Sequence, residues 1–204
     1  MTGSPDVGQL IPPVVGFTRL SSSARARSIV AAAVGIIVLG AAAALSPALD
    51  HVSATTVLGL LLIAAGVFEA IAGRLRLETR TLATLAGLAT VLAGSFLIFN
   101  RSSGLLPNAT IVTAWLLIRS VILLFTSRLA HGSVRKFLGI SAATDFVLGA
   151  GLLVGLSVTT LAVTIFGPSP QLLASYGFVL ALSFMTTGIL LLEVASCERG
   201  RAQI

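Results

Sequence analysis

The chain has 204 residues, of which 56% are hydrophobic and only 10% are charged, and its mean hydropathy is +1.04. Soluble domains carry about 25% charged residues, so this composition excludes a soluble globular domain and indicates an integral membrane protein. The formal net charge of +6 does not indicate a nucleic-acid-binding protein, because the basic residues punctuate apolar segments instead of clustering along one stretch.

The first 24 residues have a composition that resists regular structure. They contain three prolines, three glycines and the serine run Ser21 to Ser23. Such a segment has too few large apolar residues to bury a core. We therefore expect residues 1–24 to form a flexible cytoplasmic tail.

Six apolar segments follow, each close to the roughly 20 residues that an α-helix needs to cross a hydrocarbon core of about 30 Å. The predicted spans are 28–46, 54–73, 81–99, 108–127, 137–156 and 171–194. Taken in pairs they form hairpins over 28–73, 81–127 and 137–194. The sequence thus predicts an all-α integral membrane protein, with a six-helix membrane domain over 25–199 and a short cytoplasmic tail over 200–204.

The distribution of Lys and Arg predicts the orientation of these helices. Of the 13 basic residues, 11 fall before the first span, after the last span or in the two connections between hairpins. Arg101 alone falls in a connection on the opposite side, and Arg119 alone falls within a span. Because positive residues accumulate on the cytoplasmic side, we expect both termini to be cytoplasmic.

The three hairpins show traces of an internal repeat. A shift of 54 residues places Gly40 on Gly94, a shift of 109 places Gly40 on Gly149, and a shift of 122 places Gly66 on Gly188. Since every copy begins and ends on the same side, the repeats are expected to be parallel, about an axis along the membrane normal. The difference between the last two shifts indicates about 13 extra residues within 157–170, which we expect either to prolong the fifth helix beyond the membrane or to form an extended lid. In either form we expect this insert to be a contact surface.

Spaced glycines in paired spans (Gly35, Gly40, Gly59 and Gly66), a proline in the first outer turn (Pro47) and basic inner ends, repeated three times, resemble the HdeD family. The resemblance covers about residues 25–199. It implies a small six-helix protein of the bacterial inner membrane that is associated with acid resistance.

Three ionisable residues within the spans are the candidate site: Glu69, Arg119 and Asp145. Each should face the bundle interior, because exposure to lipid near the midplane costs about 2.5 to 3.5 kcal/mol. Arg119 lies nine residues before Arg128, and Asp145 lies nine residues after Lys136. We therefore expect Arg119 and Asp145 to form an ion pair at matched depth between neighbouring helices.

A competing prediction has Arg119 turn to Glu69, which would free Asp145 as a proton or ligand site. Glu69 itself is predicted to be a proton or cation site, to be hydrogen-bonded between helices, or to reach the inner membrane interface five residues away.

Six glycines are predicted at close helix contacts. Gly59, Gly66 and Gly73 recur every seven residues, so they lie on one helix face together with Glu69. The remaining three are Gly40, Gly94 and Gly149.

No nucleophile with a neighbouring base, phosphate-binding loop or set of metal ligands is recognisable, so we expect neither an enzyme nor a metal site nor a cofactor. The two histidines fall on opposite sides of the predicted membrane, and Cys197 is the only cysteine. Three function classes stay open: an HdeD-like stress protein with a structural or interaction role, an accessory subunit of a larger membrane complex, and a proton, ion or small-solute transporter. The expected partners are the lipid bilayer and further copies of the chain or a larger membrane protein complex, and not nucleic acid.

Overall fold

The computed structural model describes residues 22–45, 51–76, 79–103, 108–166 and 171–200, and these residues form six α-helices and no β-strand. The helices are α1 Ser22–Leu45, α2 His51–Leu75, α3 Arg80–Ser103, α4 Asn108–Leu129, α5 Gly132–Phe166 and α6 Gln171–Gly200. Each contains a stretch that is long and apolar enough to cross a membrane. This is the architecture of a multi-pass membrane protein, and the predictions of an all-α fold and six spanning helices are confirmed.

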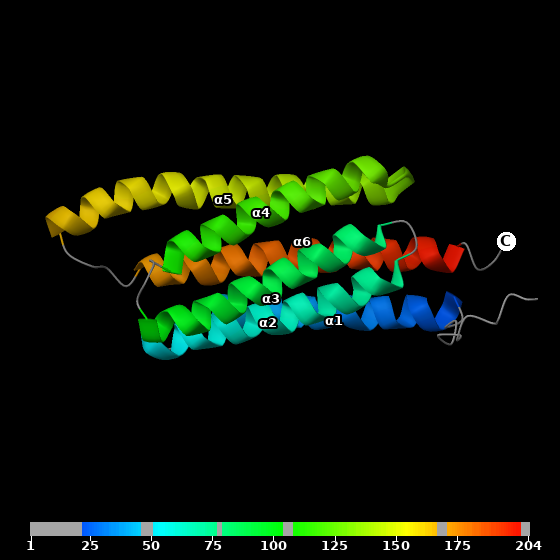
Figure 1. The fold of residues 1–204 in the computed structure, drawn as a ribbon, viewed down its shortest axis with the longest axis horizontal. Coiled ribbons are helices and arrows are strands. Elements are labelled where there is room, and N and C mark those ends of the chain that lie inside the picture. Colours follow the sequence, from blue (N-terminus) through cyan, green and yellow to red (C-terminus); the bar gives the residue numbers. More distant parts are fainter. Residues whose placement is uncertain (1–21, 46–50, 77–78, 104–107, 167–170, 201–204) are drawn as a thin grey trace, which may run out of the picture.

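The helices extend beyond the predicted spans because hydropathy detects only the apolar part of a helix. The first helix begins at Ser22, inside the segment predicted to be a tail, and the last continues to Gly200. The largest extension is in α5, whose 35 residues are about 52 Å long at 1.5 Å per residue. Of the two predictions for residues 157–170, prolongation of the fifth helix is confirmed as far as Phe166, and 167–170 lie outside the described residues. The far end of α5 projects past the other helices in Figure 1.

The six helices form a closed bundle in which each helix contacts the next along the chain and α1 contacts α6. The most extensive contacts join α2 to α3, α1 to α6, and α4 to α5. Two of these pairs are connected by short links, and the third brings together the first and last helices. The predicted hairpins α1–α2, α3–α4 and α5–α6 are therefore the less extensive contacts of the bundle (Figure 1).

The two short links lie at the same end of the bundle as the start of α1 and the end of α6, on the right in Figure 1. We call this the basic end, because Arg27, Arg74, Arg80, Arg128, Arg135, Lys136 and Arg199 are exposed there. The link between α4 and α5 turns at Gly132, whose φ of +65° is a conformation that favours glycine.

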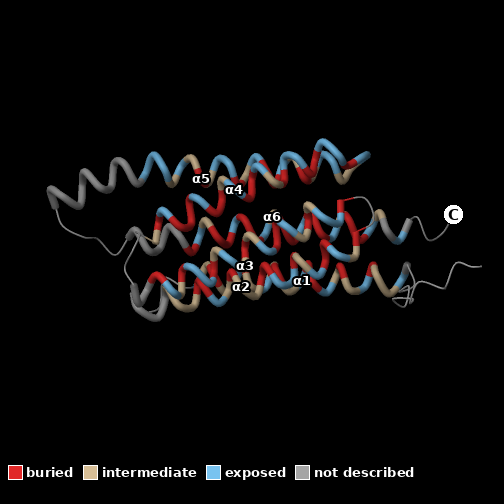
Figure 2. Tube along the Cα trace, in the orientation of Figure 1, coloured by how far each residue is buried: buried red, intermediate tan, exposed pale blue. Residues whose placement is uncertain are grey.

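Large apolar side chains cover the outside of the bundle, while charged and hydroxyl side chains lie inside. Exposed examples are Val38, Phe125 and Val147, and buried and exposed residues alternate along the described part of each helix (Figure 2). Buried polar examples are Glu69, Arg119 and Asp145. Apolar surface suits contact with lipid, and polar groups in a membrane protein are placed where protein partners can satisfy them.

Candidate functional site

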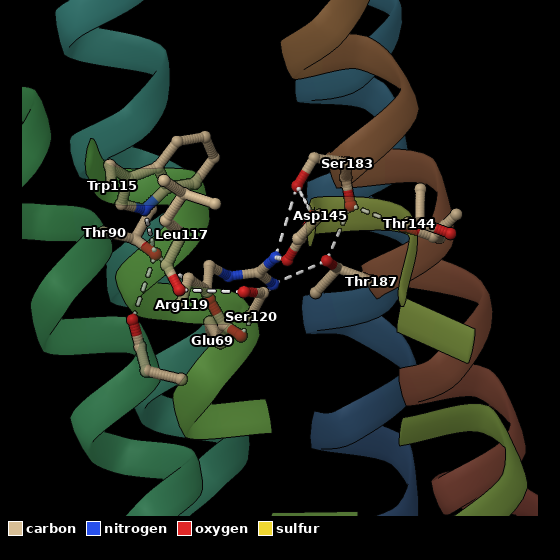
Figure 3. A network of polar contacts seen from close by, with 12 residues as sticks. Glu69, Thr90, Trp115, Leu117, Arg119, Ser120, Thr144, Asp145, Ser183 and Thr187 are labelled. Carbon is tan, nitrogen blue, oxygen red and sulfur yellow. Dashed lines mark hydrogen bonds and ion pairs between the residues drawn. The ribbon is translucent and has the colours of Figure 1, made fainter. Parts of the chain in front are cut away.

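The three ionisable residues predicted within the spans meet at one point in the bundle. Arg119 of α4 is 1% exposed, and its guanidinium contacts both carboxylates (Figure 3). Nη2 donates to Glu69 Oε1 of α2 at 2.9 Å, and Nη1 donates to Asp145 Oδ2 of α5. Asp145 is fully buried and Glu69 is 7% exposed. We call Glu69, Arg119 and Asp145 the charge cluster.

Two hydroxyl groups of α6 complete the contacts of the guanidinium. Nη1 donates to Ser183 Oγ at 3.2 Å, and Nη2 donates to Thr187 Oγ1 at 2.7 Å. Ser183 in turn donates to Asp145 Oδ1 at 2.6 Å, while Thr187 donates to the Ser183 carbonyl at 2.7 Å. Ser183 and Thr187 are four residues apart, so they share the face of α6 that points at Arg119.

Thr90 of α3 adds a further contact to the charge cluster, on the side of Glu69 away from Asp145. Thr90 Oγ1 lies 3.4 Å from Glu69 Oε2 and 3.0 Å from the Ala86 carbonyl, so its single proton can serve either acceptor. The same oxygen accepts the indole N–H of Trp115 at 3.1 Å. Through these contacts the charge cluster links five helices, α2 to α6.

Aromatic side chains cover the guanidinium. The Arg119 Cζ atom lies 5.8 Å from the centroid of the Trp115 ring, within the range of a cation–π interaction. Trp115 also makes an edge contact with Phe184 of α6, with ring centroids 6.4 Å apart.

The local sequences explain how these side chains come to face one another. On α4 the buried positions recur every three or four residues, which puts Arg119 on the same stripe as Trp115, Leu116 and Leu123. On α5 a glycine four residues after Asp145 allows close approach: a Cβ atom on Gly149 would lie 3.2 Å from Leu116 Cβ. This approach brings the short aspartate side chain within reach of the guanidinium.

A second buried arginine influences the charge cluster from the basic end. Arg76 follows the last residue of α2, and it is buried. Burial lowers the pKa of the Arg76 guanidinium to about 10, an effect that nearby Glu69 opposes and Arg119 reinforces. With both carboxyls ionised, Glu69 and Asp145 therefore balance the charges of Arg76 and Arg119.

Two polar atoms near the charge cluster have no hydrogen-bond partner among the described residues: Arg119 Nε and Ser141 Oγ. Ser141 lies one helical turn from Asp145 and is buried. Most, but not all, of the polar atoms in and beside the cluster thus have a hydrogen-bond partner.

The predicted ion pair between Arg119 and Asp145 is confirmed. The competing prediction is confirmed in one part and wrong in the other: Arg119 does contact Glu69, but this does not free Asp145, because the planar guanidinium has enough donors to engage both carboxylates. Sequence analysis did not single out Thr90, Ser183 or Thr187 for the site. The detectable signal was the spacing of Ser183 and Thr187, four residues apart in an apolar span.

The glycines predicted at helix contacts all lie against a neighbouring helix. A Cβ atom on Gly59, Gly66 or Gly73 would lie within 2.6 to 2.8 Å of an atom of α3, and the reciprocal distance for Gly94 to α2 is 2.6 Å. Gly40 faces α6 at 3.2 Å, and Gly149 faces α4 at 3.1 Å. Two further glycines in close contacts, Gly87 and Gly188, were not predicted as packing positions.

The other polar residues considered in the sequence do not join the charge cluster. His131 is exposed at the basic end, and the side chain of His51 lies outside the described residues. Cys197 is half-buried, 3.5 Å from Ser133 Oγ. Within the described part of the chain, no three His, Cys, Asp or Glu side chains are grouped so that they could hold a metal ion.

No family model matches the chain, and searches of curated proteins and of solved structures returned no match. The resemblance to the HdeD family therefore stays a prediction.

Proposed function

We propose that this chain is a protein of the bacterial inner membrane with a structural or interaction role. In this proposal the charge cluster joins the helices and does not move a solute. The observation that carries the proposal is the number of fixed contacts on one guanidinium, which engages Glu69, Asp145, Ser183 and Thr187 on three neighbouring helices. A group that exchanges protons or ligands needs a free state, and these contacts leave Arg119 and Asp145 without one.

The balance of charges supports the same role. With Glu69 and Asp145 both ionised, Arg119 and the buried Arg76 outside the cluster balance their charges without a bound proton or external ion. Ion pairs of this kind are costly to bury, but they help to specify one arrangement of helices when all partners are present.

The topology in this proposal has three parallel hairpins with both termini in the cytoplasm. Its supports are the exposed Lys and Arg residues at the basic end and the alternation of more and less extensive helix contacts around the bundle. The stress-related role, including acid resistance, rests on the resemblance to the HdeD family alone. An accessory subunit of a larger membrane complex is an alternative that fits the same geometry, and the projecting end of α5 would then be the docking element.

A second candidate function, proton or ion transport, has three observations in its favour. Glu69 is the least buried member of the charge cluster, its hydrogen bond from Thr90 is long, and Ser141 Oγ close to Asp145 has no hydrogen-bond partner among the described residues. Glu69 would be the exchanging group in that mechanism.

Vesicle reconstitution distinguishes these functions. Purified protein is incorporated into vesicles containing a pH-sensitive dye, and the external pH is lowered. For a structural role, the internal pH should fall no faster than in protein-free vesicles. If wild-type protein dissipates the gradient and the Glu69→Gln variant does not, the structural proposal is overturned in favour of proton transport.

A further inference from the structure

The outer surface of the bundle has an apolar groove between α4 and α5, and none of the charge-cluster residues lines it. It has a volume of about 340 Å³ and is lined by Ser120, Val121 and Leu124 of α4 and by Gly139, Ala143 and Phe146 of α5. This volume lies at the lower end of the range for ligand-binding pockets, about 300 to 1,000 Å³. No carboxylate lines the groove.

The floor of the groove is open because α5 has a glycine there that contacts nothing. A Cβ atom on Gly139 would meet no atom within 4 Å, whereas Gly66 and Gly149 are enclosed by neighbouring helices. Gly139 is therefore not needed for the packing of this chain, and its missing side chain leaves space on the lipid-facing surface.

Three exposed basic residues stand at the mouth of the groove. Arg128 lies one helical turn after Leu124 on α4, and Arg135 and Lys136 lie one turn before Gly139 on α5. The short link at Gly132 brings these turns of α4 and α5 to the same level at the basic end. The apolar groove thus ends next to a cluster of positive charges.

The depth of the groove corresponds to one leaflet of a bilayer. Gly139 lies three residues from Lys136 and Phe146 lies ten residues from it, which places the groove about 5 to 15 Å from the basic residues along α5. Half of a hydrocarbon core is about 15 Å thick. A lipid chain lying in the groove would have its headgroup at the level of Arg128, Arg135 and Lys136.

We propose that this groove is a specific binding site for one anionic phospholipid. One acyl chain lies against Gly139 and Phe146, and the phosphate binds Arg128, Arg135 and Lys136. Basic pockets between membrane helices bind anionic headgroups in this way. Charge favours a lipid over a second copy of the chain, because a copy in the same orientation would bring its own Arg128, Arg135 and Lys136 to the same level.

Native mass spectrometry of the protein in mild detergent tests the site, with phosphatidylglycerol and phosphatidylcholine of identical acyl chains added in parallel. Wild-type protein should retain one phosphatidylglycerol in preference to phosphatidylcholine. Replacing Arg128, Arg135 and Lys136 by Gln should weaken phosphatidylglycerol binding by about fivefold for each charge removed. Gly139→Leu should abolish the preferential retention by filling the groove, and it should leave thermal stability unchanged.

Two matched controls use the same kinds of change elsewhere. Gly151→Leu is on the same helix and also has no neighbour within 4 Å, but it is not part of the groove, so the lipid should remain bound. Arg74→Gln with Arg80→Gln removes exposed charges at the basic end on other helices and should have little effect.

Equal retention of the two lipids by wild-type protein would overturn the site, as would binding by the triple Gln variant at wild-type strength. A wild-type dimer that Gly139→Leu converts to a monomer, with no lipid retained by either, would assign the groove to a second copy instead. If Gly139→Leu is unstable, the triple Gln variant alone tests the site.

The lipid site requires that the bundle spans a bilayer. It does not require that the basic end is cytoplasmic or that the charge cluster has a structural role, so the lipid site and the proposed function can fail independently.

Discussion

Arg119 is the residue at which most of the bundle meets. A guanidinium in a membrane interior is costly to bury, and this one is stabilised by two carboxylates and two hydroxyl groups from α2, α5 and α6. Its planar arrangement of donors suits several acceptors at once, which a lysine could not reproduce. The stability of the cluster therefore depends on its being complete.

Removing Arg119 alone should be more damaging than neutralising the whole cluster. Arg119→Met leaves two buried carboxylates without their cation, which typically costs about 3 to 5 kcal/mol. Adding Glu69→Gln and Asp145→Asn removes those charges, so the triple variant should recover much of the lost stability. Thermal unfolding in detergent measures both, with Arg80→Gln as an exposed control. If the triple variant is as unstable as Arg119→Met, the loss of stability in Arg119→Met does not come from its two unpaired carboxylates.

Exchanging the charges of Arg119 and Asp145 should not restore stability, although a simple pair would allow it. Arg119→Asp would remove the guanidinium that lies 2.9 Å from Glu69 and would add a second carboxylate to the same buried region. Like charges in a buried site disfavour each other's ionised forms. In the same unfolding assay the double variant should be much less stable than wild type. Adding Glu69→Gln should raise its stability. If the double variant is as stable as wild type, Glu69 contributes little to the stability of the charge cluster.

Trp115 contributes a hydrogen bond as well as packing. Trp115→Phe keeps an aromatic ring but removes the N–H that Thr90 accepts, so it should lower the free energy of unfolding by about 1 kcal/mol. Thr90→Val should cost a similar amount, and the double variant should cost less than the two changes added together, because they share one interaction. If the two losses of stability are strictly additive, Trp115 and Thr90 do not share a hydrogen bond.

At the scale of the helices, glycine spacing determines which faces approach most closely. Gly59 and Gly66 of α2 face Gly94 and Gly87 of α3, and Gly73 faces Ala83, so that the backbones of the two helices approach closely. Without a hydrophobic force between helices in lipid, such close van der Waals contact is a principal source of association. The glycines of α2 and α3 thus hold Glu69 next to Thr90.

Gly66 should not tolerate a side chain. A Cβ atom there would lie 2.7 Å from the Gly87 carbonyl oxygen and the Val91 nitrogen, which are backbone atoms that cannot move aside. Gly66→Ala should cost about 1 to 3 kcal/mol, and Gly66→Leu should cost more and disrupt the bundle. Gly151→Ala is the control, since nothing lies near that position. Unchanged thermal stability of Gly66→Leu in detergent would contradict this packing.

At the scale of the whole molecule, the bundle is closed by contact between its first and last helices. A Cβ atom on Gly188 of α6 would overlap Ile37 Cγ1 of α1, and one on Gly40 of α1 would lie 3.2 Å from Phe184 Cβ. The start of α1 and the end of α6 lie at the same end of the bundle, where the exposed basic residues also lie (Figure 1).

The orientation of the bundle can be measured with single cysteines in a Cys197→Ser background. Leu45 is 72% exposed at the end of α1 away from the basic end, and Arg80 is exposed at the basic end. If the basic end is cytoplasmic, a membrane-impermeant thiol reagent added to intact cells should label Leu45→Cys and not Arg80→Cys. Both should react after lysis. Labelling of Arg80→Cys alone in intact cells would reverse the orientation.

The sequence by itself determined the elements of this fold. Apolar segments of spanning length can form only helices when water is absent, because every backbone polar group must then be satisfied within its own segment. The same reasoning required Glu69, Arg119 and Asp145 to face inward, and matched depth on adjacent antiparallel helices predicted the pair of Arg119 and Asp145. Seven-residue glycine spacing likewise predicted a close contact for one face of α2.

Only the tertiary structure decided which helices share the charge cluster. Depth along a helix follows from counting residues, but the neighbours of α2 and α6 around the bundle depend on how all six helices pack. For that reason Glu69 and Asp145 could be treated as competing partners of Arg119, when the fold makes both of them partners. Ser183 and Thr187 join them because α6 packs beside α5, and their hydroxyl groups gain a role only from the charges that this packing places beside them.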